Sequence, residues 1–373
     1  MLAAFASQIF LPLVQILDST RFLAIITWFP VASARASRAS RLSRLSRRFD
    51  CPSRFYVYSD AAWFAAGASQ GPGEFDLHFS ISHPAAPKLR DRSLPGDIPS
   101  ASVIIACYND ADIVERNLAA FARQSRQDFE IVIADDGSSQ EYRPMLERWT
   151  PRFAHPIQHV RHEDLGFRKT RIQNRAVLVS RSAYLIFIDA DCLPHHNFVR
   201  NHLGYVEPDM ALAGRRTEVA RQDIPSAEQI LKRGVGLGPA RLVWLWLRGR
   251  VHMIEHGFVF PFAGEVYGRG ILGSNFSLWK KDLEKINGFN AAFVGPGWED
   301  TDIDFRLQLV GVRIKILRHK IVEYHVDHAP RVWSDALNQE RLIASQQNRI
   351  SRAEIGLAEI QEGDFDHRVY GRR

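Results

Sequence analysis

Two aspartates follow a short apolar run, in the sequence Asp189-Ala190-Asp191. The run at 184–188 is continuous, β-branched and aromatic, which predicts a strand buried on both faces of a parallel sheet, and Pro194 prevents its continuation. Ligands of α/β sheets bind at the carboxyl ends of such strands. Because two buried neighbouring carboxylates cannot easily both ionise without a cation, the pattern predicts a divalent ion that also holds a phosphate.

A second acidic group, with Glu299, Asp300 and Asp302, follows Trp298 and two glycines. A helix is indicated here by three apolar residues at helical spacing: Ile303, Leu307 and Val310. Capping against the helix dipole is the plain explanation for acids at such a position, but the four acids within the six positions 299–304 exceed what capping needs. A carboxylate beside an aromatic platform is suited to act as the general base that activates a sugar hydroxyl.

Three further motifs have residue types that suit the same ligand. Four cations on a predicted helix after Gly166 form a positive face suited to diphosphate, with an ordinary solvated surface as the alternative: Arg168, Lys169, Arg171 and Arg175. Asp135-Asp136-Gly137 ends a predicted strand and suits either a nucleoside or a plain turn. His325 and His328 have spacing that suits a metal, and the ion predicted at Asp189 and Asp191 strengthens that interpretation over a surface pair.

Several elements must position these groups. A strand–helix–strand pattern is predicted at the spacing of a parallel sheet. Its strands are 102–107 and 129–134, and its helix runs through residue 122 with Asp112 as the N-cap. Residues 271–279 read as a strand in which Gly273 allows close backbone approach, and 313–317 as an edge strand. A helix is predicted over 336–360 with Leu337, Leu342 and Ile343 inward, and the residues beyond 362 as frayed. The absence of a G-x-G-x-x-G motif after the first strand argues against dinucleotide binding.

Composition limits the class of protein. The 373 residues are 46% hydrophobic and 24% charged, as in globular proteins. Three cysteines without paired spacing argue against a disulfide framework and a thiolate zinc site, and favour a reducing compartment. Much of the net charge of +6 comes from one tail, so it does not indicate nucleic-acid binding.

The first 98 residues are predicted to be an extension that precedes the catalytic body. An apolar segment at 2–31 is interrupted by Asp18 and Arg21, which favours an interfacial helix over a spanning one. The arginine- and serine-rich arm at 34–48 is suited to anionic lipid, with a solvated arm or sequence upstream of the true start as the alternative. The predicted division is therefore an extension at 1–98, a catalytic domain at 99–335, and a helix and tail at 336–373.

Taken in order, these motifs resemble the inverting glycosyltransferases of family 2, which have the GT-A fold, an α/β fold with a mostly parallel sheet flanked by helices. The likeness covers roughly 102–328. Residues 106–109, 135–138 and the D-x-D at 189–191 are similar to the nucleotide-binding motifs, and 166–174 to a segment of chondroitin-polymerase-like members. Residues 273–277 and 297–300 resemble the C-terminal half shared with galactosyltransferases, although Pro296-Gly297-Trp298 replaces the usual Gly-Trp-Gly-Gly.

The resemblance implies a role for each matching position. It implies Mn²⁺ or Mg²⁺ on Asp191 and His328 with His325 as a second imidazole ligand, Asp300 as the base, and the acceptor on Trp298 and Glu299. The nucleotide-binding positions would be Tyr108, Asp136, Arg168, Asn174, Asp189 and Ala190. The partners implied are a UDP-sugar donor and a glycan or lipid-linked acceptor. The location implied is cytoplasmic, with peripheral contact at the inner membrane face through the arm.

Two other functions remain open from the residues alone. A nucleotidyltransferase would use the same aspartates and release pyrophosphate, but it leaves 298–300 unexplained. A non-catalytic carbohydrate- or membrane-binding protein would use the arm and an inactive fold.

Overall fold

The computed structural model describes residues 99–260, 262–328, 335–361 and 363–371. The predicted extension at 1–98 lies outside the described residues. Within the part of the chain that is described, no helix combines the length and apolar character needed to cross a bilayer.

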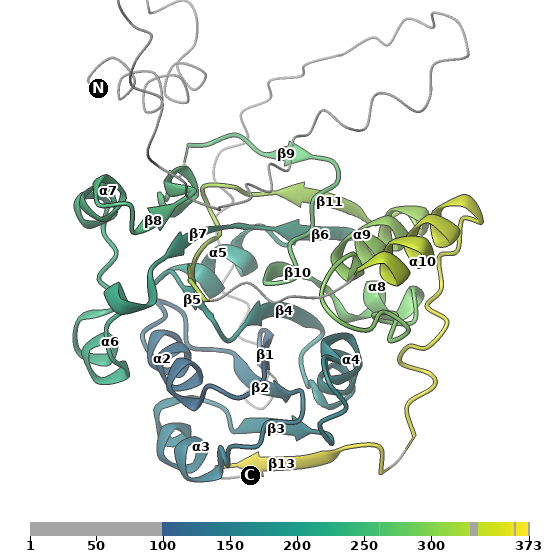
Figure 1. Cartoon of the computed structure of the whole chain (residues 1–373), viewed down its shortest axis with the longest axis horizontal. Coiled ribbons are helices and arrows are strands. Elements are labelled where there is room, and N and C mark those ends of the chain that lie inside the picture. Colours follow the sequence, from purple (N-terminus) through teal and green to yellow (C-terminus); the bar gives the residue numbers. More distant parts are fainter. Residues whose placement is uncertain (1–98, 261, 329–334, 362, 372–373) are drawn as a thin grey trace, which may run out of the picture. The chain divides into compact units, whose positions relative to one another are not determined.

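A nine-stranded sheet forms the centre of the described chain, in the order β13-β3-β2-β1-β4-β10-β6-β11-β9 (Figure 1). Neighbours from β3 to β4 are parallel, as are β6 and β11, whereas β10 and the two outermost strands are antiparallel to their neighbours. The strands are β1 (Ser102–Cys107), β2 (Glu130–Asp135), β3 (Ile157–Arg161), β4 (Tyr184–Asp189), β6 (Met210–Ala213), β9 (Val266–Tyr267), β10 (Asn275–Trp279), β11 (Arg313–Ile316) and β13 (Asp366–Tyr370). The predicted α/β class with a mostly parallel sheet is confirmed.

Helices cover both faces of this sheet (Figure 1). In β1, Val103 and Ile105 pack with α2, α3 and α5, whereas Ile104 between them packs in a second core with α4, α8 and α9. Because side chains alternate along a strand, burial on both faces requires the uninterrupted apolar run seen in the sequence. The helices are α2 (Ala111–Phe121), α3 (Arg143–Trp149), α4 (Lys169–Val179), α5 (Phe198–Gly204), α6 (Ala227–Arg233), α7 (Pro239–Leu247), α8 (Lys280–Lys285), α9 (Glu299–Leu309) and α10 (Ala336–Gln347).

A smaller four-stranded sheet has the order β5-β12-β7-β8. It consists of β5 (Cys192–Pro194), β7 (Arg215–Val219), β8 (Val251–His252) and β12 (Val322–Val326). β5 follows directly after the aspartates that end β4, and it pairs antiparallel with β12. This pairing connects the centre of the large sheet to a strand from the far end of the chain.

Two local predictions are wrong. Asp110 caps α2 in place of the predicted Asp112, because its Oδ1 accepts the N–H of Ile113 at 3.2 Å. Asn109 and Asp110 both have positive φ, which these residue types tolerate better than most, so the turn is tighter than the sequence suggests. β11 is also not an edge strand, since it pairs with both β6 and β9.

The C-terminal part also differs from the prediction. α10 ends at Gln347, and Leu342 is buried while Leu337 and Ile343 are 71% and 44% exposed. The buried stripe of α10 consists of Asn338, Leu342 and Ser345, so two of its positions are polar and give no apolar signal. The segment predicted to be frayed contains β13, which pairs with β3 through its backbone while most of its side chains are exposed.

A buried arginine, ion-paired within α9, fixes that helix to the loop after α8. Arg306 Nε donates to Asp302 Oδ2 at 2.7 Å, and both side chains are 1% exposed. Arg306 Nη1 also donates to the carbonyls of Ile286 and Gly288, at 2.9 and 2.8 Å. Burial raises the pKa of Asp302, and the guanidinium opposes that rise. Asp302 is therefore a structural residue of the acidic group at the start of α9.

We predict that Arg306→Met lowers the free energy of unfolding by about 3–5 kcal/mol, because it leaves the Asp302 carboxylate buried without a partner. Urea denaturation measures the loss. The double variant Asp302→Leu/Arg306→Met should recover part of it, since no buried charge remains. Arg341→Met, which breaks an exposed pair with Glu354, is the control and should unfold at the wild-type urea concentration. A wild-type midpoint for Arg306→Met would contradict the assignment.

Candidate active site

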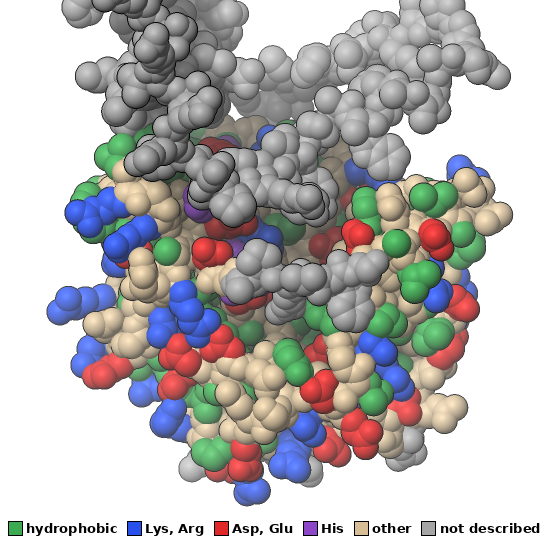
Figure 2. Space-filling view, in the orientation of Figure 1, with side chains coloured by type: hydrophobic (Ala, Val, Ile, Leu, Met, Phe, Trp, Pro, Cys, Tyr) green, Lys and Arg blue, Asp and Glu red, His purple; other side chains and the backbone are tan. Residues whose placement is uncertain are grey.

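A cavity of about 610 Å³ opens at the carboxyl ends of the central parallel strands. Its walls include the ends of β1 and β4, the turn after β2, and the end of β12. The predicted site residues that line it are Tyr108, Asp136, Asp189, Ala190, Asp191, His325 and His328. Figure 2 shows acidic and histidine side chains gathered around the hollow near the middle of the view.

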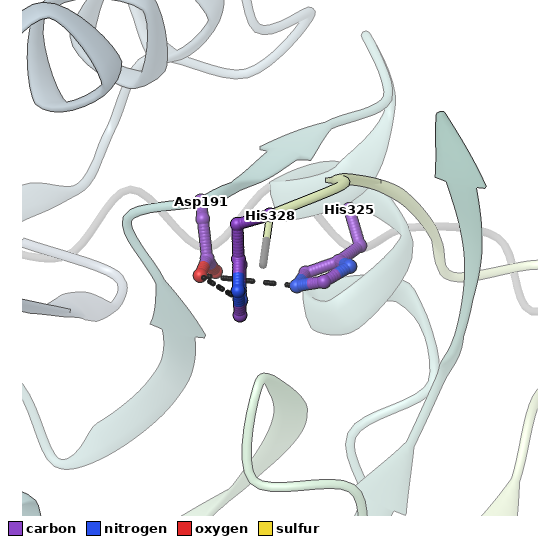
Figure 3. Close-up of side chains that lie close together, drawn as sticks. All are labelled: Asp191, His325 and His328. Atoms are coloured by element: carbon purple, nitrogen blue, oxygen red, sulfur yellow. Dashed lines mark ion pairs between the residues drawn. The ribbon is translucent and has the colours of Figure 1, made fainter. Parts of the chain in front are cut away.

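Asp191, His325 and His328 form a compact cluster in this cavity (Figure 3). One ligand atom from each residue lies within 4.8 Å of the other two. The Nε2 atoms of His325 and His328 lie 3.8 and 3.5 Å from Asp191 Oδ2. Among the described residues, this cluster has the donors and spacing that a metal ion requires.

Strand pairing brings these residues together. His325 on β12 stands opposite Cys192 on β5, and the N–H of Val326 donates to the carbonyl of Asp191 at 2.7 Å. His328 follows two residues after the strand and turns its ring toward His325, with ring centroids 5.2 Å apart. The backbone ladder therefore sets the distance between the carboxylate and the imidazoles.

The donor set favours one metal of the predicted pair. Burial, together with the charge of Arg216, lowers the pKa of His325 to about 4, so its ring is neutral at pH 7 and can bind a metal. Mg²⁺ prefers oxygen ligands, whereas transition metals accept imidazole nitrogen as well as carboxylate. Two imidazoles with one carboxylate therefore fit Mn²⁺ better than Mg²⁺.

Asp189 has a different partner from Asp191. Lys169, at the start of α4, places its Nζ 2.6 Å from Asp189 Oδ1. Burial opposes the charge on Lys169, but Asp189, Asp300 and Glu299 together raise its pKa. The prediction that one divalent ion neutralises both aspartates is therefore corrected, because a lysine already neutralises Asp189.

The backbone of the D-x-D segment is held by a residue of α2 that the sequence analysis did not single out. Asn117, fully buried on α2, donates from Nδ2 to the carbonyls of Ala190 and Cys192, at 3.1 and 2.7 Å. The N–H of Ala190 donates to the carbonyl of Ala106 at 2.9 Å. A polar residue on an apolar helix face is the signal that could have identified Asn117.

Asp136 is held in a hydrogen-bonded chain. Its Oδ1 lies 2.7 Å from Nε2 of His162, and its Oδ2 accepts the N–H of Arg168 at 2.8 Å. Arg175 is buried and contacts Nδ1 of the same histidine. Because arginine only donates, Nδ1 must accept, which places the proton of His162 on Nε2, facing Asp136. Tyr108 donates to Asp164 at 2.9 Å across the same part of the cavity.

The predicted positive face on α4 is wrong. Arg175 points into the protein, Lys169 pairs with Asp189, and Arg168 and Arg171 line a separate cavity of about 220 Å³. The cations that line the main cavity among the described residues are Lys169, Arg216 on β7 and Arg221. Arg216 and Arg221 were missed because isolated arginines on a strand and in a turn form no sequence pattern.

Asn174 does not reach the main cavity. Its Nδ2 donates to the carbonyl of Phe289, and its Oδ1 accepts the N–H of the same residue, both at 2.8 Å. The side chain is 1% exposed. These contacts fasten α4 to the loop that leads to α9, so the structure gives Asn174 a positioning role.

The acids of α9 stand beside Lys169, next to the main cavity. Asp300 Oδ2 accepts the N–H of Gly273 at 2.8 Å, and a Cβ on Gly273 would fall 2.1 Å from Asp300 Oδ1, so only glycine fits there. Burial raises the pKa of Asp300, while Lys169 opposes the rise. Burial and the charge of Asp300 raise the pKa of Glu299 to about 7. Trp298 caps this helix with φ of 72° and donates to Asp335 at 2.9 Å.

The sequence matches two family models in consecutive segments. Residues 102–234 match Glycosyl transferase family 2. Residues 259–329 match the model described as the N-terminal domain of galactosyltransferase. The first match includes the D-x-D segment, and the second includes α9 and both histidines of the cluster.

Curated relatives agree with these matches. The chain is 26% identical over 265 residues to validoxylamine A glucosyltransferase of Streptomyces hygroscopicus subsp. jinggangensis, with 66% of this chain and 61% of that protein covered. It is 27% identical over 230 residues to chondroitin synthase of Escherichia coli, with 57% of this chain and 33% of that protein covered. The chain thus spans less than two thirds of the length of either relative.

A solved structure of GalNAc-T7 with UDP, GalNAc and Mn²⁺ aligns with 68% of this chain and 50% of that chain, at 12% identity and a TM-score of 0.49. That score is too low to carry an inference. The family matches, in the order that the motifs predict, confirm the resemblance to the family 2 glycosyltransferases over 102–234 and to the galactosyltransferases over 259–329.

Proposed function

We propose that the protein is a metal-dependent inverting glycosyltransferase that moves a hexose or N-acetylhexosamine from a UDP-sugar to a hydroxyl of a glycan or lipid-linked acceptor. The observation that carries the proposal is the cluster of Asp191, His325 and His328 in the cavity that also contains Asp136 and Asp189. A nucleoside diphosphate needs a cation at one end and hydrogen-bond acceptors at the other. This cavity offers both.

Asp136 would accept a hydrogen bond from the nucleoside, with Tyr108 beside it. Arg216 would supply positive charge for the diphosphate, since Lys169 pairs with Asp189 and Arg221 with Asp110. Asp191, His325 and His328 would hold Mn²⁺, which when bound neutralises the departing diphosphate as a Lewis acid.

Asp300 would act as the base. It would take the proton of the acceptor hydroxyl as that oxygen bonds to the anomeric carbon, while the bond from that carbon to UDP breaks on the opposite face. One displacement of this kind inverts the configuration. Trp298 and Glu299 would hold the acceptor next to Asp300, and Gly273 would fix the Asp300 carboxylate through its N–H.

The cellular location belongs to the same proposal. The protein would act in the cytoplasm, and the arginine arm at 34–48 would provide peripheral contact with the inner membrane face. The arm lies outside the described residues, so this rests on its sequence alone.

We predict that Asp300→Asn lowers turnover by about 10²–10⁴-fold, because an amide cannot accept the hydroxyl proton. A screen of UDP-hexoses and N-acetylhexosamines with Mn²⁺ would first establish activity through UDP release. UDP affinity, measured by calorimetry, should be unchanged in the variant. Asp209→Asn, which alters an exposed acid outside the cavity lining, is the control. Pyrophosphate as the product, or loss of UDP binding in Asp300→Asn, would contradict the proposal.

We predict that kcat/KM falls as the pH drops below about 7, where Glu299 takes up a proton and loses the negative charge that makes it a strong hydrogen-bond acceptor for the acceptor hydroxyl. Glutamine cannot titrate, and it also removes a negative neighbour of Asp300. The Glu299→Gln profile should therefore lack the fall near pH 7. An acid limb at the same pH in both proteins would refute the assignment.

We predict that His328→Ala weakens Mn²⁺ binding by about tenfold or more, the equivalent of about 1.4 kcal/mol for one lost ligand. The paramagnetic resonance signal of free Mn²⁺ reports binding without any need for activity. His196→Ala, at an exposed histidine outside the cavity lining, should bind Mn²⁺ like the wild type. Equal affinity in all three proteins would remove His328 from the ligand set.

A further inference from the structure

One segment of the described chain belongs to neither family match. Residues 235–258 lie between the two matched ranges. The overlapping stretch 229–254 contains five lysines and arginines in total, and no aspartate or glutamate. It contains α7, whose sequence is Pro-Ala-Arg-Leu-Val-Trp-Leu-Trp-Leu. This segment, between the two matches, combines positive charge with large apolar side chains.

α7 has two different faces. Leu242 and Leu245 are fully buried against the protein. On the outward side, Trp244 is 48% and Leu247 is 63% exposed. Their spacing of three residues places both on one side of the helix. An exposed tryptophan and leucine at the same face are costly in water unless something covers them.

The charges around this face indicate what covers it. Arg241 and Arg248 are exposed near opposite ends of α7. Arg241 donates to the carbonyl of Asp223 at 2.9 Å, and the guanidinium of Arg248 lies 4.4 Å from the ring of Trp244. In Figure 2, cationic and hydrophobic side chains lie together at the place of α7 in Figure 1. Arg250 is already paired with Asp223 at 3.2 Å, so it is not counted here. Tryptophan, leucine and arginine side by side match the boundary between acyl chains and anionic headgroups.

We propose that the outward face of α7, formed by Arg241, Trp244, Leu247 and Arg248, docks on an anionic lipid bilayer. A second copy of the chain fits this face less well, because a two-fold contact would oppose arginines to arginines. The arginine arm at 34–48 also carries only positive charge, so it would be repelled. The docking is independent of the donor chemistry.

Docking here would also fix the orientation of the cavity. The segment is tied to the small sheet because β8 pairs with β7, which in turn pairs with β12. Tyr324 on β12 also donates to the carbonyl of Leu237, at 3.4 Å. Since β12 carries His325, the segment that contains α7 is connected to the proposed metal site through one hydrogen-bonded sheet. A lipid-linked acceptor would thus meet the cavity at a set angle to the bilayer.

The test is sedimentation of the full chain with phosphatidylcholine vesicles that contain phosphatidylglycerol. We expect Trp244→Ser/Leu247→Ser to lower the vesicle partition coefficient by about tenfold, because two apolar anchors are lost. Arg241→Gln/Arg248→Gln should lower it too and weaken its dependence on salt. The matched control, Ile343→Ser/Ile350→Ser, removes apolar residues that are 44% and 45% exposed elsewhere on the surface and should sediment like the wild type.

The arm requires a second background, because its arginines could bind the same vesicles. The α7 variants are therefore repeated in a full chain whose arm arginines are replaced by glutamine, where the loss should persist and be larger. Unchanged sedimentation of the α7 variants in both backgrounds would overturn the proposal. So would a change confined to self-association in analytical ultracentrifugation, which would show that a second copy covers the face. Mn²⁺ binding in each variant reports separately whether the catalytic site is intact.

Discussion

The antiparallel pairing of β5 with β12 is the interaction on which the site depends. It joins a three-residue strand after the D-x-D segment to a strand more than a hundred residues later in the chain, and its register sets His325 opposite Cys192. Without this ladder, Asp191 would end a strand as an isolated carboxylate, and the histidines would belong to a distant loop. The hydrogen bond from Val326 to the carbonyl of Asp191 closes the last step of the ladder, at 2.7 Å. A metal site here therefore draws its geometry from backbone hydrogen bonds rather than from side-chain packing.

Charge balance is the second constraint, and Lys169 supplies it. Three carboxylates, those of Asp189, Glu299 and Asp300, lie near this one ammonium. Lys169 contacts Asp189 directly, and it opposes the rise that burial causes in the pKa of Asp300. For Glu299, Lys169 does not offset burial and the charge of Asp300, and the pKa of Glu299 rises to about 7. One lysine at the start of α4 thus links the nucleotide end of the cavity to the acids proposed to handle the acceptor.

Much of this could be predicted from sequence wherever burial leaves an uninterrupted signal. The central strands are apolar on both faces, so β1 and β4 were recognised with nearly their true bounds, and the motifs at their ends followed. Prediction failed where backbone or polar contacts decide the structure: β13 pairs through its main chain, and the inward stripe of α10 includes Asn338 and Ser345. Arg175 was assigned to a solvent-facing cluster, because helical spacing does not reveal which arginine turns inward to a histidine.

That inward turn of Arg175 has a chemical consequence for the nucleoside end of the cavity. A guanidinium is always a donor, so its contact with Nδ1 keeps the His162 proton on Nε2, where it faces Asp136. Asp136 then receives one donor on each oxygen, from His162 and from the N–H of Arg168, and cannot rotate without losing both. Its remaining lone pairs can only accept. Under the proposed function, this carboxylate therefore selects a nucleoside that presents N–H or O–H groups to it, and a base that presents only acceptors there would set acceptor against acceptor.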